Sequence, residues 1–73
     1  MTTTQYAPAT RTVALTGDEH LDLVVACGVA ADRLHALAAE CAAAGDKMNA
    51  DVFSAREAKY RALRERVLTA DYV

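Results

Sequence analysis

The chain has 73 residues, of which 53% are hydrophobic and 25% charged, and its formal net charge is −2. A chain of this length forms one small domain at most, and such a domain buries only a little over half of the surface that its unfolded chain exposes. The acidic balance argues against nucleic acid or an anionic membrane as the partner of the surface as a whole. The uncharged run in the most apolar part of the sequence, residues 23–31, is far shorter than the roughly 20 residues that cross a bilayer.

Residues 1–11 are expected to form a flexible tail, because they are rich in threonine and contain Pro8. They have neither the basic nor the apolar region of a secretory signal, so we expect a cytoplasmic location. Two cysteines, Cys27 and Cys41, lie about 21 Å apart if one helix carries both, which is too far for a disulfide. We interpret them as reduced core residues, with a bridge between the two chains of a dimer as the alternative.

Residues 12–15 alternate weakly between polar and apolar types. One interpretation is a short strand, which would need to pair with a second subunit or with the sheet edge of another protein. The other is an extended lead-in, in which Val13 and Leu15 only cover the start of the following helix. Under either interpretation Val13 and Leu15 are candidate interaction residues.

A long helix is expected over about residues 17–44, and the rest of the chain is organised around it. Alanine dominates this stretch and is the best helix former. Thr16 and Glu19 have the spacing of a capping box at its start. Gly45 follows its end, where a left-handed residue commonly closes a helix.

Two apolar columns run along this helix at steps of three and four residues. One holds the large side chains, and its members are Leu23, Cys27, Ala30, Leu34, Leu37, Cys41 and Ala44. The other is built almost wholly of small residues that permit close approach of a neighbour: Val24, Gly28, Ala31, His35, Ala38 and Ala42. Both columns together make a face too wide for one partner, so we expect two neighbours or an oligomer. His35, on the small column, is interpreted as an interface residue.

A second helix is expected over about residues 47–69, with Asp46 or Asn49 as its N-cap. Its apolar stripe comprises Met48, Val52, Phe53, Tyr60, Leu63 and Val67. The opposite side is expected to carry Glu57, Arg61, Arg64 and Glu65. Glu57 and Arg61 are spaced four residues apart, which gives weak mutual support on a helix.

Arg56 interrupts the apolar stripe of the second helix. If its guanidinium were buried it would need a carboxylate, and the expected register brings Glu40 or Asp32 within reach. The alternative is a side chain that extends to the edge of the stripe and remains in water. Arg56 and its neighbour Tyr60 are therefore candidate partner-binding residues.

No cofactor, metal site or catalytic centre is predicted. The histidines and cysteines of the long helix, His20, Cys27, His35 and Cys41, are spaced too widely along one axis to share a zinc ion. The three glycines are isolated, so no phosphate-binding loop is present in the sequence. Two long helices also offer no obvious concave pocket, and we do not expect an enzyme.

The predicted fold is all-α: an antiparallel two-helix hairpin over residues 12–73 with a short extended N-terminal segment, dimerising into a four-helix bundle. The expected function is a non-enzymatic protein–protein interaction module, an adaptor or inhibitor of a cytoplasmic protein. The alternative is a DNA-associated regulator or antitoxin-like dimer that uses Arg61 and Arg64. A composition rich in Ala, Arg, Val and Asp with little Lys is typical of actinobacterial genomes and their phages, which favours a phage-encoded host modulator.

Overall fold

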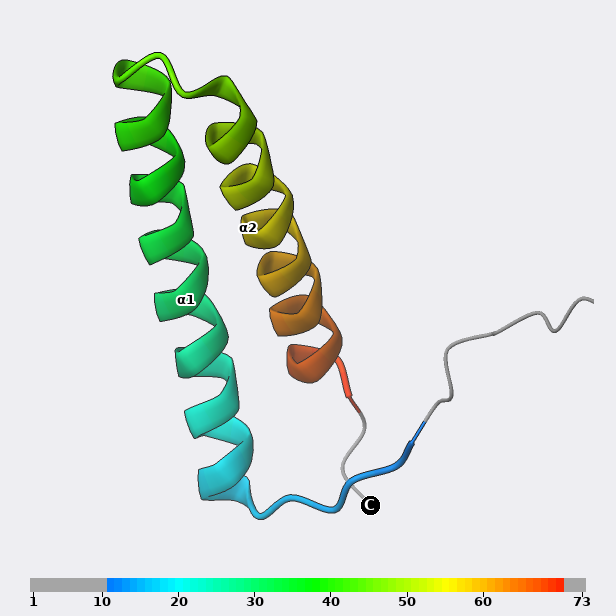
Figure 1. Cartoon of the computed structure of the whole chain (residues 1–73). Helices are drawn as coiled ribbons and strands as arrows, with labels where there is room; N and C mark the ends of the chain where they lie inside the picture. Colours follow the sequence, from blue (N-terminus) through cyan, green and yellow to red (C-terminus); the bar gives the residue numbers. More distant parts are fainter. Residues whose placement is uncertain (1–10, 71–73) are drawn as a thin grey trace, which may run out of the picture.

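The computed structural model describes residues 11–70, which form two helices joined by a tight turn. Helix α1 spans Gly17–Ala43 and helix α2 spans Lys47–Leu68. They lie antiparallel and side by side along most of their length (Figure 1). The predicted helical hairpin is confirmed, with boundaries within one residue of those expected from the caps.

Residues 11–16 precede α1 without forming a helix or a strand. Within the described chain these residues are the extended lead-in, and a strand that pairs with another chain stays a prediction. Val13 is 71% exposed and Leu15 is 41% exposed, so neither is held in the hairpin core. The tail predicted for residues 1–11 lies almost entirely outside the described residues.

The start of α1 is closed by the predicted capping box. The backbone N–H of Glu19 donates to Thr16 Oγ1 at 3.2 Å, and the backbone N–H of Thr16 donates to Glu19 Oε1 at 2.9 Å. Donation from the Thr16 backbone and side chain lowers the pKa of the Glu19 carboxyl. Two helix-end amides that would otherwise lack partners are thereby satisfied.

The turn between the helices depends on Gly45 and Asp46. Gly45 has φ of +78°, in the left-handed region that an L side chain rarely adopts. Its N–H donates to the carbonyl of Ala42 at 3.1 Å, which satisfies one orphan group at the end of α1. Asp46 is the N-cap of α2, because its Oδ1 accepts from the backbone N–H of Asn49 at 3.2 Å.

The contact face of α1 is its small-residue column. The buried residues of the described chain are Val24, Cys27, Ala31 and Ala38, and three of these four belong to that column. Ala31 is 0% exposed and marks the closest packing. The large-residue column lies to one side of this contact: Leu34, Leu37 and Cys41 are half-buried, and Leu23 is exposed. Small side chains therefore allow α2 to approach closely, as predicted.

The contact face of α2 differs from the predicted one. Its half-buried helical residues are Ala50, Phe53, Glu57, Arg64 and Val67, which recur at steps of three and four. Only two members of the expected stripe, Phe53 and Val67, are among them. The expected opposite side was also wrong in part, because Glu57 and Arg64 face α1. The hairpin accepts these polar residues because Arg64 can pack its aliphatic stem while Glu57 forms hydrogen bonds.

This arrangement leaves the hairpin with a small core. No large side chain of the described residues is fully buried, and no residue of α2 is buried. Eleven large hydrophobic residues of the described part of the chain are instead exposed to solvent. The architecture thus places much of its apolar surface outside the contact between the two helices.

Candidate functional site

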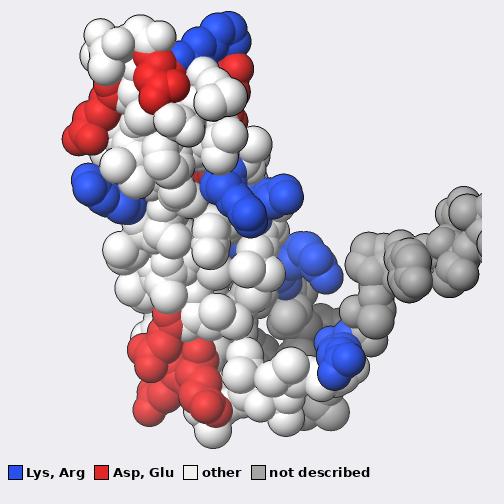
Figure 2. Space-filling view, viewed as in Figure 1, with Lys and Arg blue, Asp and Glu red and all other residues white. Residues whose placement is uncertain are grey.

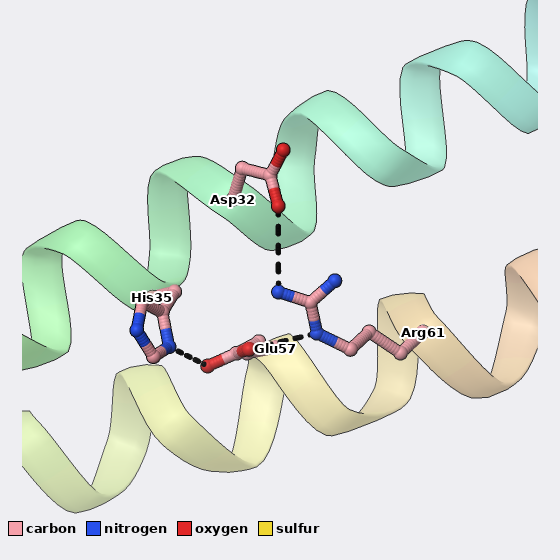
Figure 3. Close-up of polar contacts among 4 residues, drawn as sticks. All are labelled: Asp32, His35, Glu57 and Arg61. Atoms are coloured by element: carbon pink, nitrogen blue, oxygen red, sulfur yellow. Dashed lines mark hydrogen bonds and ion pairs between the residues drawn. The ribbon is translucent and has the colours of Figure 1, made fainter.

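A polar network joins the two helices along one flank of the hairpin (Figure 3). Glu57 lies at its centre: its Oε1 accepts from His35 Nδ1 at 3.1 Å and its Oε2 accepts from Arg61 Nε at 2.8 Å. Arg61 also donates from Nη2 to Asp32 Oδ1 at 3.4 Å. The network therefore alternates acid and base, and it connects the third and fourth turns of α2 to the middle of α1.

The charges of this network support one another. The hydrogen bond from Arg61 lowers the pKa of the Glu57 carboxyl, and His35 adds to the same effect. The bond to Glu57 in turn raises the pKa of the Arg61 guanidinium. The Glu57 side chain is 16% exposed, whereas that of His35 is 71% exposed. We call this polar network, which lies at the edge of the contact between the helices, the clasp. Its four residues are already paired with each other.

Arg64 is half-buried beside Gly28. A Cβ atom placed on Gly28 would lie 3.6 Å from Arg64 Nε and 3.8 Å from its Cδ, so the arginine stem crosses α1 where that helix has no side chain. Arg61 and Arg64, both predicted as interaction candidates, are thus used in holding α2 against α1. His35 is brought into the same flank through Glu57.

A different flank of α2 carries the remaining candidates. We call it the basic flank, and its members are Val52, Arg56, Lys59, Tyr60, Leu63 and Arg66. Arg56, Lys59, Tyr60 and Leu63 line one shallow, open pocket. Tyr60 and Leu63 are 38% and 39% exposed. Arg56 is exposed as well, so the alternative in which it remains in water is correct, and Asp32 binds Arg61 instead.

The outer side of α1 carries a second open surface that the sequence analysis did not single out. We call it the acidic ridge, and its members are Asp18, Leu21, Asp22, Val25 and Val29. The three apolar residues repeat every fourth position and are 60%, 55% and 64% exposed in chain order. Their regular spacing was the signal available in the sequence. It was overlooked because the two broader columns account for most of the apolar residues of this helix.

Acidic and basic side chains gather in separate places on the hairpin. On the face seen in Figure 2, acidic side chains lie over the first turns of α1, at the bottom of the view, and again near the turn at the top, while several basic side chains lie between them over α2. Within residues 11–70, no group of three or more metal-type side chains is close enough to hold an ion.

His20 ties the open end of the hairpin together. Its Nε2 donates to the backbone carbonyl of Val67 at 2.7 Å, across 47 residues of sequence. The carbonyl belongs to the last turn of α2, where helix carbonyls lack partners within the helix. His20 therefore has a structural role in the hairpin.

Comparison with known proteins gives no relative. No protein-family model, no curated protein and no solved structure matches the chain. Among the described residues, neither helix combines the length and the apolar character that a membrane span requires. The observations that bear on function are therefore those of the hairpin surface itself.

Proposed function

We propose that this chain is a small, non-enzymatic protein–protein interaction module that self-associates, with a dimer of hairpins and four helices as its simplest assembly. The observation that carries the proposal is the large apolar surface that the hairpin leaves in water. Leu21, Val25 and Val29 are more than half exposed on α1, as are Met48 and Val52 on α2. The three on α1 lie one helical turn apart and form a row, and an exposed apolar row is typical of a site that another chain covers.

The energetics of a two-helix fold support the same proposal. Fixing the backbone costs about 1–2 kcal/mol per residue, and apolar burial must offset most of that cost. The buried class here contains one valine, one cysteine and two alanines, which are small side chains. A second chain packed on the exposed residues would supply the missing burial, as helices do when they form bundles.

A DNA-associated regulator receives less support from the geometry. Arg61, on which that alternative depended, is paired with Glu57 and Asp32, and Arg64 is half-buried against α1. Phosphate contacts need arginine and lysine side chains that are free to reach the nucleic-acid backbone. Two of the bases that remain available, Arg56 and Lys59, lie beside Tyr60 and Leu63, a mixture better suited to a protein surface.

The proposal is tested by unfolding the protein in urea at several protein concentrations. If association stabilises the folded chain, the midpoint of unfolding rises with protein concentration by mass action. Circular dichroism at the helix band reports the folded fraction. A midpoint that stays constant from dilute to concentrated solution would contradict self-association.

A further inference from the structure

We infer that the acidic ridge on α1 of one chain docks on the basic flank of α2 of a second copy, so that the hairpins associate head to tail. This inference rests on the proposed self-association and names the two surfaces that carry it. The other possible occupants of the basic flank, an unrelated acidic protein or a nucleic acid, are outcomes that the experiment below separates.

The two surfaces are complementary in charge and alike in apolar content. At about 100° per residue, the acidic ridge covers a sector of α1 that, between residues 18 and 29, contains Asp18 and Asp22 but no lysine or arginine. The basic flank covers a sector of α2 that contains Arg56, Lys59 and Arg66 but no aspartate or glutamate. Each sector also carries at least three exposed apolar side chains. Such a pattern suits two helices that bury apolar contacts between rows of ion pairs.

The charges of the two surfaces, which include Arg66 of the flank, form no ion pair within residues 11–70 of one hairpin. The ion pairs among the described residues connect His35, Glu57, Arg61 and Asp32, and separately Lys47 with Asp51. Asp18 and Asp22 on the ridge form no ion pair with another described residue. Arg56 and Lys59 on the flank form none either. A second copy would therefore gain ion pairs without breaking any that the hairpin already has.

The spacing of the two surfaces allows a common register. Antiparallel helices advance by equal steps in opposite directions, with a rise of about 1.5 Å per residue. A register that sets Leu21 of one copy level with Leu63 of the next also sets Asp18 level with Arg66. In the same register Val25 is level with Lys59 and lies beside Tyr60. Asp22 then lies within one helical turn of both Lys59 and Tyr60. This docking repeats the antiparallel order that α1 and α2 already have within the hairpin.

The position of the surfaces determines the symmetry of the assembly. The ridge points away from α2, because its residues lie on the side of α1 opposite to buried Cys27 and Ala31. The basic flank lies on the side of the hairpin away from the clasp formed by Glu57 and Arg61. A contact between unlike surfaces is heterologous, and it either closes into a ring or continues into longer assemblies. Head-to-tail docking therefore predicts growth beyond two chains.

The test exchanges the charges of the two surfaces. One variant carries Asp18→Lys and Asp22→Lys, and the other carries Lys59→Glu and Arg66→Glu, the two bases nearest to those aspartates in the register above. We expect each variant by itself to have the mass of one chain, 7.8 kDa, in light scattering at concentrations where the unaltered protein grows. An equal mixture should grow again, because each altered surface then meets a complementary one. Neutral variants, Asp18→Asn with Asp22→Asn and Lys59→Gln with Arg66→Gln, should show intermediate growth alone and no recovery when mixed.

Each remaining outcome decides against the inference. Growth of either reversed variant by itself, or a mixture that stays at 7.8 kDa while circular dichroism shows intact helices, would overturn head-to-tail docking. If a reversed variant loses its helices, the neutral pair replaces it, and unchanged growth in both neutral variants overturns the inference. A mass fixed at twice 7.8 kDa in every variant would overturn it but leave the proposed self-association standing. A single-chain mass for the unaltered protein would overturn both.

Discussion

Arg64 of α2 lies across Gly28 of α1, with its Nε 3.6 Å from the place where a Cβ of residue 28 would stand. The contact occurs in the small-residue column, next to fully buried Ala31. A long polar residue can occupy this contact face because its aliphatic stem packs on the bare helix backbone while its guanidinium reaches the edge. The close approach of the two helices thus depends on small side chains in α1 and on a flexible one in α2.

Gly28→Ala should stabilise the hairpin. The added methyl group would meet Arg64 at ordinary van der Waals distance, and alanine favours a helix over glycine by about 0.8–1.0 kcal/mol. Urea unfolding at one fixed protein concentration measures the gain. Gly45→Ala is the matched control, because φ of +78° makes that substitution unfavourable by about 1–2 kcal/mol. A loss of stability for Gly28→Ala would mean that the two helices are closer than described.

Ala31→Leu should destabilise the hairpin by about 1–3 kcal/mol, because it forces three extra heavy atoms into the closest part of the contact. Ala31 is 0% exposed, so its new side chain could only be accommodated by moving α2. Ala36→Leu, at an exposed position of the same helix, is the control and should change stability little. Equal effects of the two substitutions in urea unfolding would argue against the small-residue column as the contact.

Thr16→Ala should cost about 1 kcal/mol by removing the N-cap of α1. The backbone N–H of Glu19 would lose its acceptor, and the Glu19 carboxylate would lose the orientation that the box provides. Thermal unfolding followed by circular dichroism measures the change. Thr69→Ala at the other end of the hairpin is a useful comparison, since its hydroxyl donates to carbonyls within its own helix turn.

The clasp centred on Glu57 should make stability depend on acid pH. Its carboxyl has a lowered pKa in the folded chain, chiefly because of Arg61, so the ionised form favours folding. This contribution is complete above the unfolded pKa, about 4.3, and is lost as the pH falls through the lower folded pKa. The stability difference between the unaltered chain and Glu57→Gln should therefore be largest near neutral pH and shrink towards pH 3. A difference that is constant across this range would contradict the clasp.

The structure of α1 could be predicted in detail because its determinants are local. Thr16 and Glu19 are three residues apart, Gly45 follows the last turn, and the alanine-rich column has an unambiguous helical period. Small residues on one face predict a close neighbour without specifying which residues that neighbour contributes. These features therefore gave the helix, its ends and its contact face.

The contact face of α2 could not be obtained in the same way. The most apolar stripe, which includes Val52 and Leu63, is turned away from α1, and the face in contact contains Glu57 and Arg64. A polar residue on a contact face is accepted only if a particular neighbour satisfies it, and that neighbour lies on the other helix. The acidic ridge of α1 was missed for the same reason, since an open surface is defined by what the partner helix does not cover.

The most direct measurement of self-association is the mass of the unaltered protein in solution, determined by light scattering from dilute to concentrated samples. Head-to-tail self-association predicts a mass near 7.8 kDa at the lowest concentrations. The mass should rise past twice that value as further copies cover the apolar surfaces of α1 and α2. Circular dichroism on the same samples verifies that the helices are formed. A fully helical protein whose mass remains at 7.8 kDa at every concentration would contradict self-association.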